Sequence, residues 1–231
     1  QWLFRSTHKN AQRFTNTKRR GSGLCNNSIL RSLLSREGKK ILMGVDEAGR
    51  GCLAGPVVSA SVAIYEHQII KGVDDSKALS SKKREVLYDL IQKHSLSFSI
   101  ATIDNRVIDQ KNILVATMQS MKDAINAIEI SVDEIIVDGP HKPVMDNERD
   151  SITRGEIGGD KLFHCISAAS IIAKVYRDNF MIELHQQFPE YNFKKHKGYP
   201  TKDHIQAIKD LGPTPFHRLS FKSELYDEVT V

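Results

Sequence analysis

The sequence has few of the residues that build disulfide or zinc-stapled folds. Its 3 cysteines, Cys25, Cys52 and Cys165, form neither a CxxC pair nor an even framework. This pattern favours a reducing, intracellular setting over a secreted disulfide scaffold. The 9 histidines are scattered, without an HExxH motif or a Cys/His pair at zinc spacing. We therefore expect no dedicated zinc site.

Long hydrophobic runs are missing as well, although 40% of the residues are hydrophobic. No window approaches the roughly 18 consecutive apolar residues that a membrane-spanning helix needs. A chain of 231 residues can still bury a substantial core. It can do so as one large domain or as one domain with an appendage.

Acidic residues are absent from the start of the chain. Residues 1–36 hold eight Lys or Arg and no Asp or Glu, which leaves 25 bases and 28 acids for the rest. We interpret residues 1–38 as a basic, disordered tail: an organelle transit segment, an arm for nucleic acid, or translated sequence upstream of the true start. The missing initial Met favours the last of these. We expect a cytoplasmic protein, or an organellar one if the tail is a transit segment.

The rest of the chain alternates between strand and helix patterns. Strand patterns cover residues 40–45, 57–64, 96–103 and 134–137. Two helical patterns cover residues 108–128 and 166–188. A third begins after a cap at Ser80 or Ser81, and a fourth begins after a cap at Thr201 and stops at Gly212-Pro213. Residues 141–160 are charged and typical of a loop. This order predicts an α/β or α+β domain with a mixed sheet.

Two strand patterns end on acids. The stretch GVDEAGRG places Asp46 and Glu47 directly after an apolar strand, and Asp138 follows the strand at 134–137. If these strands are parallel neighbours, Asp46 and Asp138 emerge at the same end of the sheet, where ligand sites of open α/β sheets usually lie. Glu47 joins them if the glycines bend the chain out of the regular pleat. Asp160 is a fourth candidate.

Clustered carboxylates need a cationic ligand. At an effective dielectric near 20, two carboxylates about 4 Å apart repel by roughly 4 kcal/mol, so several together must take up protons or bind cations. Oxygen-only ligands indicate Mg²⁺ or Mn²⁺, the ions of two-metal phosphodiester hydrolysis. The alternative is that each Asp merely forms a turn or caps a helix. Nearby acids that compete with Asp160 are Asp146, Glu148, Asp150 and Glu156.

Six blocks of residues 41–221 form a series along the chain. They are GVDEAGRGCLAGPVVSASV, DDSKALSSKKRE, IDQKNILVATMQSM, IIVDG, GDKLFHCISAASIIAKVYRD, and HKGYPTKDH with GPTPFHRLSF. In this order they resemble the signature blocks of the ribonuclease HII family. The resemblance implies an α/β, ribonuclease H-like mixed sheet flanked by helices, with a catalytic domain over 39–190. A small helical C-terminal segment, 191–231, would pack on this domain and bind substrate.

The resemblance also implies an activity and assigns residues to it. The activity is endonucleolytic cleavage of the RNA strand of RNA/DNA hybrids and incision of DNA at embedded ribonucleotides, leaving 3′-hydroxyl and 5′-phosphate ends. The catalytic, metal-binding acids would be Asp46, Glu47, Asp138 and Asp160, holding two Mn²⁺ or Mg²⁺ ions. The residues that read the ribose 2′-hydroxyl would be Gly49, Arg50, Gly51 and Tyr199. Glycine lets backbone groups approach a sugar closely, and only a hydroxyl can answer them.

Three features depart from the family pattern. Cys52 stands where proline is usual after GRG, a change that would loosen the loop. Gly158 and Gly159 precede Asp160 where a lysine and a glycine are common, and the 141–159 segment looks longer than typical. These departures leave the placement of Asp160 open. The related ribonuclease HIII would have Glu at this position.

A body of net charge −3 needs local bases to bind nucleic acid. Candidates for phosphate contacts are Lys77, Lys174, Arg177, Lys194, Lys195, Lys197 and Arg218. We expect a monomer without membrane contact that acts on hybrids and ribonucleotide-containing duplexes. A catalytically silent hybrid-binding protein need not keep four acids. An enzyme of small phosphate or nucleotide substrates would want a GxGxxG or P-loop after the first strand, which DEAGRGCLAG does not match.

Overall fold

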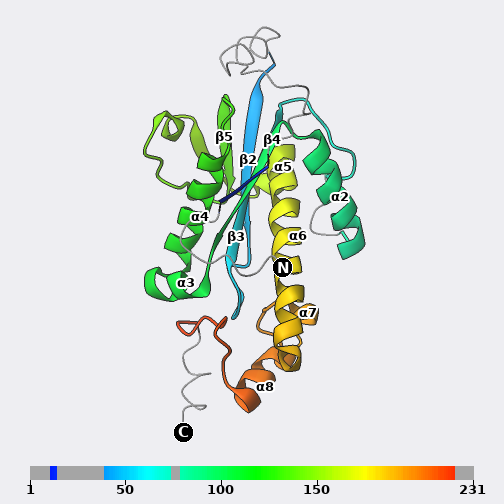
Figure 1. Ribbon diagram of the computed structural model, residues 1–231. Coiled ribbons are helices and arrows are strands. Elements are labelled where there is room, and N and C mark those ends of the chain that lie inside the picture. Colours follow the sequence, from blue (N-terminus) through cyan, green and yellow to red (C-terminus); the bar gives the residue numbers. More distant parts are fainter. Residues whose placement is uncertain (1–10, 15–38, 74–78, 222–231) are drawn as a thin grey trace, which may run out of the picture.

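A mixed sheet of six strands forms the centre of the molecule (Figure 1). The structure is a computed structural model, and it describes residues 11–14, 39–73 and 79–221. The strands lie in the order β1-β4-β3-β2-β5-β6. Their bounds are β1 (Ala11–Phe14), β2 (Ile41–Ala48), β3 (Val57–Tyr65), β4 (Ser97–Ile103), β5 (Glu134–Asp138) and β6 (Thr153–Glu156).

Strand β2 lies in the middle of the sheet and changes its direction of pairing. It runs antiparallel to β3 and parallel to β5, with Val45 opposite Val137. The sequence analysis required these two strands to be parallel neighbours, and they are. The carboxyl ends of β2 and β5 therefore lie together at one end of the sheet. The mixed sheet predicted from the sequence is confirmed.

Helices cover both faces of the sheet. The described helices are α2 (Ser81–His94), α3 (Asn105–Lys111), α4 (Ile113–Ala127), α5 (Gly159–Leu162), α6 (His164–Gln187), α7 (Phe193–His196) and α8 (Lys202–Leu211). The 3₁₀ turns are η3 (Glu148–Asp150) and η4 (Pro189–Tyr191). Caps predicted from the sequence are present, since the side chain of Ser80 accepts from the Lys83 amide and that of Thr201 from the His204 amide.

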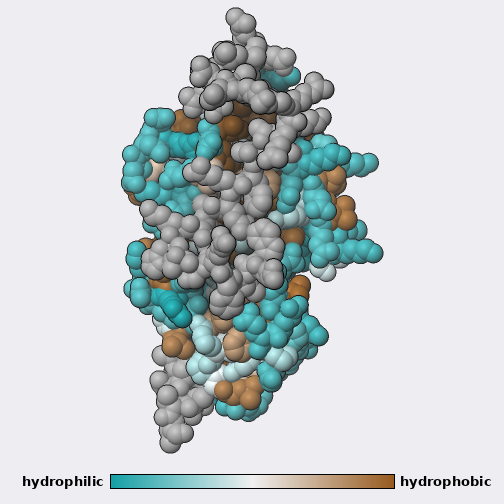
Figure 2. All heavy atoms as spheres, in the orientation of Figure 1, coloured by the Kyte–Doolittle hydropathy of each residue, from teal (hydrophilic) through white to brown (hydrophobic). Residues whose placement is uncertain are grey.

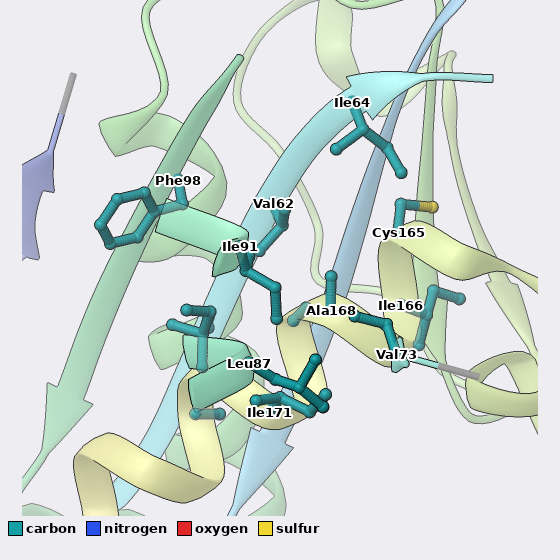
Figure 3. Close-up of a cluster of buried hydrophobic side chains, with 14 of the residues drawn as sticks. Val62, Ile64, Val73, Leu87, Ile91, Phe98, Cys165, Ile166, Ala168 and Ile171 are labelled. Carbon is teal, nitrogen blue, oxygen red and sulfur yellow. The ribbon is translucent and has the colours of Figure 1, made fainter. Parts of the chain in front are cut away.

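Strand alternation divides the core between two faces. On one face, Val62, Phe98 and other strand residues pack against α2 and α6 (Figure 3). On the other face, Met43 and Val137 pack against Met121 of α4. Gly44 of β2 allows α6 to pack closely on the sheet, because a Cβ added to it would lie 2.2 Å from the backbone carbon of Cys165. The sheet end that carries the acids is thereby fixed against α6.

The C-terminal elements pack together beyond the end of α6. Turn η4, α7 and α8 enclose a separate apolar cluster that includes Phe193 and Ile208, and Figure 1 shows them at one end of the molecule. The cluster also contains Leu53 and Ala54 from the loop after β2. A β-bridge between Ala54 and His217 ties this loop to the C-terminal segment. The GRG loop is thus held between the sheet and the C-terminal helices.

Three expectations about secondary structure need correction. The helix predicted over 108–128 is two helices, because Asn112 adopts a left-handed φ of 72°, ends α3 and caps α4. The segment 141–160, predicted as a loop, contains β6 and η3. Residues 11–14 of the tail, expected to be disordered, form β1 and pair antiparallel with β4. The other residues of 1–38 lie outside the described residues.

The surface has polar and apolar areas. On the face drawn in Figure 2, hydrophilic residues predominate and hydrophobic ones form small separate areas. Large exposed apolar side chains include Ile69, Val144 and Ile157. Among the described residues, no helix is both long enough and apolar enough to cross a membrane.

Candidate active site

Two aspartates lie on neighbouring parallel strands at the same end of the sheet. Asp46 belongs to β2 and Asp138 ends β5, one residue beyond the paired residues Val45 and Val137. Adjacent strands lie about 4.8 Å apart, so the two carboxyl groups are neighbours. Asp46 also hydrogen-bonds Ser170 of α6. Ser170 was not singled out in the sequence; its signal is a serine among the small residues that open α6.

Asp160 joins this pair from α5. Its backbone N–H donates to Asp138 Oδ1 at 3.3 Å, and its side chain is buried. Gly159 permits the approach, since an added Cβ would lie 2.6 Å from Ile166 Cδ1 and 3.5 Å from Asp138 Oδ1. Gly159 therefore lets Asp160 lie close to Asp138, and the placement left open by the sequence is beside the strand ends.

Glu47 reaches the site without the bend expected from the sequence. Strand β2 stays regular through Ala48, with Glu47 opposite Ser59 of β3, and the chain turns only at Gly49, whose φ is 95°. Glu47 nevertheless lines the cleft described below. Its Oε1 accepts a hydrogen bond from Arg50 Nη1 at 3.2 Å. The expectation that the glycines bend Glu47 out of the pleat is thus wrong.

The acids at the strand ends repel one another. Burial is the main cause that raises the pKa of Asp46 well above its usual value, and the charges of Glu47 and Asp138 raise it further. Burial also raises the pKa of Glu47, against the opposing effect of Arg50, and Asp138 adds to the increase. The repulsion within such a group of buried carboxyls is reduced when one of them binds a proton or when the group binds a cation.

The carboxylates need some rearrangement before they can hold a metal ion. Among the described residues, no three His, Cys, Asp or Glu side chains are arranged to hold one in their present conformations. Asp46 Oδ1 accepts the Glu47 amide at 2.7 Å, and Glu47 is held by Arg50. The donor chemistry fits a hard divalent cation, because every candidate ligand atom is a carboxylate oxygen. Chelation would require Glu47 to leave Arg50.

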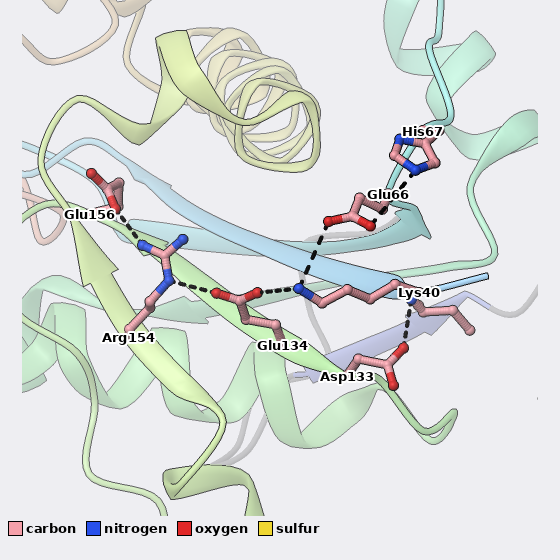
Figure 4. Close-up of polar contacts among 8 residues, drawn as sticks. Lys40, Glu66, His67, Asp133, Glu134, Arg154 and Glu156 are labelled. Carbon is pink, nitrogen blue, oxygen red and sulfur yellow. Dashed lines mark hydrogen bonds and ion pairs between the residues drawn. The ribbon is translucent and has the colours of Figure 1, made fainter. Parts of the chain in front are cut away.

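The competing acids of the 141–160 segment have cationic partners of their own. Asp146 pairs with Lys122 at 2.6 Å, and Asp150 with Lys142 at 3.1 Å. Glu156 pairs with Arg154, in a row of charges that continues through Glu134 to Lys40 (Figure 4). Glu148 is exposed in η3. Asp160 therefore remains the acid of this region that adjoins Asp138.

A cleft of about 390 Å³ opens beside the acids. Its lining residues are Glu47, Ala48, Gly49, Arg50, Gly51, Arg84, Ser170, Ile171, Lys174 and Tyr199. The cleft brings together the GRG loop, the start of α2, the middle of α6 and the loop before α8. Lys174 lies over the Tyr199 ring at 5.4 Å and pairs with Asp178 at 2.7 Å. Arg84 was missed in the sequence, where its block indicated only a helix start.

Two arginines predicted to contact phosphates are instead buried and structural. Arg177 donates to the backbone carbonyls of Ala54, Pro56 and Lys197. Arg218 donates to those of Arg50 and Gly55. Both side chains have 0% exposure. Arg218 thus holds the GRG loop at Arg50, and Arg177 holds the chain that follows it, so the expectation of phosphate contacts is wrong for both.

The remaining predicted bases are spread more widely. Lys77 lies outside the described residues. Lys194 and Lys195 are exposed on α7, where Lys195 pairs with Asp203 at 2.7 Å. The Lys197 ammonium donates to the Lys194 carbonyl. Of the predicted bases that the structure describes, Lys174 lines the cleft, and Lys194, Lys195 and Lys197 are not among its lining residues.

Cys52 supports the loop that it was expected to loosen. Its amide donates to the Gly49 carbonyl at 3.4 Å, a bond that a proline could not make. Its side chain is fully buried and hydrogen-bonds Tyr199. Burial raises the pKa of Cys52 and that of Tyr199. The side chain of Tyr199 therefore rests on Cys52 and Lys174 while 40% of the residue stays exposed.

Comparison with known proteins gives consistent matches over the described domain. The family model for ribonuclease HII matches residues 43–224. The chain is 46% identical over 188 residues to the ribonuclease HII of Caldicellulosiruptor bescii, covering 81% of this chain and 89% of that protein. It is 48% identical over 182 residues to the ribonuclease HII of Burkholderia pseudomallei, covering 79% and 83%.

A solved structure agrees with these sequence matches. The ribonuclease H2 of Pyrococcus horikoshii OT3 superimposes with a TM-score of 0.70 at 26% identity, covering 81% of this chain and 97% of that one. The superposition covers nearly the whole of that protein, so the similarity is not limited to one part of its fold.

Proposed function

Because this chain belongs to the ribonuclease HII family and is therefore a ribonuclease H-type endonuclease of RNA/DNA hybrids, we propose that it also incises duplex DNA at embedded ribonucleotides. We assign the catalytic work to Asp46, Glu47, Asp138 and Asp160. The proposal rests above all on one observation, the convergence of these acids at the carboxyl ends of β2 and β5. We also propose that the protein acts as a monomer, since one chain supplies every residue of the site.

The family depends on divalent metal ions, and we assign two, Mg²⁺ or Mn²⁺, to the four acids. Bound there, the ions would activate a water and stabilise the leaving oxygen, giving 3′-hydroxyl and 5′-phosphate ends. The chain itself contributes a group of carboxylate oxygens that repel one another when no ion is bound. Ser170 holds Asp46, and the Asp160 amide holds Asp138, so two of the carboxylates are oriented before any ion binds.

The GRG loop and Tyr199 are assigned to recognition of the ribose. Gly51 is exposed, and a Cβ placed there would meet no atom within 4 Å, so its backbone is open to a ligand. Backbone N–H and C=O groups that approach a sugar closely can bond a 2′-hydroxyl, which DNA lacks. Tyr199 faces the same cleft and can stack beneath the sugar. This makes residues 191–231, as far as they are described, the substrate-binding segment on a catalytic domain of residues 39–190.

Two bases that line the cleft are assigned to the phosphates. Lys174 and Arg84 approach it from α6 and α2. Lys174 is already paired with Asp178, which orients its ammonium, and Arg84 donates to the Leu79 carbonyl at 2.5 Å. Their charges offset the repulsion between the substrate backbone and the clustered acids. Arg50 is bonded to Glu47, and it would become available if that acid held a metal ion.

The proposal predicts a metal-dependent nick at a single ribonucleotide. A DNA duplex with one embedded ribonucleotide is incubated with the protein, with and without Mg²⁺ or Mn²⁺, and the ends are mapped. We expect one cut next to the ribonucleotide, with 3′-hydroxyl and 5′-phosphate ends, only when metal is present. An all-DNA duplex of the same sequence is the control. Cleavage of hybrids without any cleavage of the duplex that carries the ribonucleotide would overturn the incision proposal.

Tyr199 provides a test of ribose recognition. We expect Tyr199→Ala to lose about tenfold or more in kcat/KM on the single-ribonucleotide duplex and clearly less on a long hybrid. The reason is that a hybrid offers many registers, whereas the duplex offers one junction. Tyr199→Phe, which keeps the ring and loses only the hydroxyl that meets Cys52, should stay close to the parent on both. Equal losses of Tyr199→Ala on both substrates would contradict the assignment.

A further inference from the structure

We propose that His204 and His217 are positioning residues for Tyr199, acting through a chain of hydrogen bonds that fixes the backbone at Tyr199. The two imidazole rings are in direct contact, with 3.1 Å between their Nε2 atoms. His204 Nδ1 lies 3.0 Å from the Tyr199 carbonyl oxygen. At the other end, the Thr214 amide donates to His217 Nδ1 at 2.8 Å, and the Thr214 hydroxyl lies 2.9 Å from the same nitrogen. The role of Tyr199 in this inference rests on the proposed function.

The chain of bonds determines which nitrogen of each ring carries the proton. A backbone amide can only donate, so His217 Nδ1 must accept and the proton of the neutral ring lies on Nε2. This Nε2–H donates to His204 Nε2, which leaves the proton of His204 on Nδ1. The carbonyl of Tyr199 can only accept, and it receives that Nδ1–H. Every bond thus has one donor and one acceptor, in a single direction from Thr214 to Tyr199.

A third histidine supports the same loop from the other side. The Gly198 amide donates to His196 Nδ1 at 3.2 Å, so the proton of His196 lies on Nε2 and is donated to the Tyr191 carbonyl at 2.7 Å. The Tyr199 amide in turn donates to the His196 carbonyl at 2.9 Å. Both backbone polar groups of Tyr199 are therefore bonded: the amide to His196, and the carbonyl to His204 and to the Thr201 amide at 2.8 Å.

The same loop is joined to the GRG loop. The Leu53 amide donates to the Gly198 carbonyl, and the Arg218 amide to the Leu53 carbonyl, both at 2.8 Å. His217 precedes Arg218, whose guanidinium bonds the Arg50 carbonyl at 2.8 Å. One hydrogen-bonded unit thus sets the two ribose-reading elements, the GRG backbone and the Tyr199 ring, at a fixed separation across the cleft.

Burial keeps the chain of bonds in its neutral form. His204 has 0% and His217 has 1% exposure, and burial lowers their pKa values to about 4 and about 3. If His217 Nδ1 were protonated, its N–H would face the N–H of Thr214, with no acceptor between them. If His204 Nε2 were protonated, its N–H would face the Nε2–H of His217 in the same way. Both events require a pH far below neutrality, so the geometry is constant at working pH.

The tautomers can be measured without any substrate. In ¹⁵N-labelled protein at neutral pH, long-range ¹⁵N–¹H correlation spectra tell protonated from unprotonated ring nitrogens. We expect the proton on Nδ1 of His204 and on Nε2 of both His217 and His196. His204 with its proton on Nε2 would overturn the proposal, because that ring could not donate to Tyr199. This result is independent of whether the protein cuts at ribonucleotides.

Cleavage then tests the positioning role. We expect His204→Leu to lose about tenfold in kcat/KM on the single-ribonucleotide duplex and less on a long hybrid, as for Tyr199→Ala. His204→Asn should recover most of the difference, because its side-chain amide can donate to the Tyr199 carbonyl from the place of Nδ1. The positioning role would be contradicted if His204→Leu lost equally on the two substrates, or if His204→Asn were no more active than His204→Leu. In either case His204 would only stabilise the fold. If the parent protein does not cut the single-ribonucleotide duplex, the proposed function fails while the tautomer result still stands.

Discussion

Asp138→Asn is expected to lower the rate of cleavage by about 10³-fold or more, equivalent to roughly 4 kcal/mol of barrier. The change replaces one carboxylate oxygen by an amide nitrogen and leaves the shape of the side chain. The Asn oxygen can still accept the Asp160 amide that now donates to Asp138. Folding and hybrid binding should therefore survive while the metal ligands are incomplete. The measurement is single-turnover cleavage of a hybrid and of the single-ribonucleotide duplex in Mg²⁺.

The same variant should be more stable than the parent in the absence of metal. The charge of Asp138 helps to raise the pKa of Asp46 above its ordinary value of 3.8. A group whose folded pKa is raised stabilises the fold below the unfolded pKa and loses this contribution as pH rises. Removing the Asp138 charge therefore gives a gain that grows above about pH 4, on the order of 1 kcal/mol at neutral pH. Unfolding by urea in EDTA at pH 4 and pH 7 measures it.

Metal should reverse this order of stability. A ligand that binds only the folded state stabilises it, so Mg²⁺ or Mn²⁺ should raise the melting temperature of the parent and not that of Asp138→Asn. Asp146→Asn is the matched control, because Asp146 is an exposed partner of Lys122 on the loop. It should leave cleavage unchanged. Cleavage by Asp138→Asn within a few fold of the parent would remove Asp138 from the site.

The strand ends could be predicted from the sequence because the signal is local. Asp46 and Asp138 each follow a short apolar run, and strand pairing alone decides whether they meet. The parallel register of β2 and β5 supplies that one missing fact. Asp160 could be chosen over the neighbouring acids only by resemblance, since its position depends on Gly159 and on the contact of α5 with β5. Neither leaves a periodic pattern in the sequence.

Other parts of the site depend on tertiary contacts that no sequence pattern reports. Arg177 looks like a surface base on a long helix, yet its guanidinium bonds three backbone carbonyls in the interior. The histidines of the last segment look scattered, yet His204 and His217 meet through the turn after α8. The sequence shows one continuous helical pattern around Asn112. The structure breaks it there, because the left-handed φ of Asn112 lets this residue end one helix and cap the next. In each case the deciding partner is distant in sequence or is a backbone group.

The second large effect is expected from Gly44→Ala, which should destabilise the fold by about 3 kcal/mol or more. Ala normally improves on Gly in a strand, by roughly 0.5–1 kcal/mol. Here the added Cβ would lie 2.2 Å from the Cys165 backbone carbon, 2.3 Å from the Ile166 nitrogen and 2.4 Å from the Cys165 oxygen. These are backbone atoms of α6, which cannot rotate away. The helix would have to move off β2, and Ser170 would be carried away from Asp46.

Gly51→Ala is the matched substitution with the opposite outcome. A Cβ at Gly51 meets no atom within 4 Å, so urea unfolding of this variant should match the parent within about 0.5 kcal/mol. If the GRG backbone touches the ribose, the new methyl group will still weaken cleavage of the single-ribonucleotide duplex by raising KM. Gly44→Ala should therefore lose stability first, and Gly51→Ala should lose only substrate recognition. A stable Gly44→Ala protein would contradict the packing of α6 on β2, and a fully active Gly51→Ala protein would contradict the close approach of the sugar to this loop.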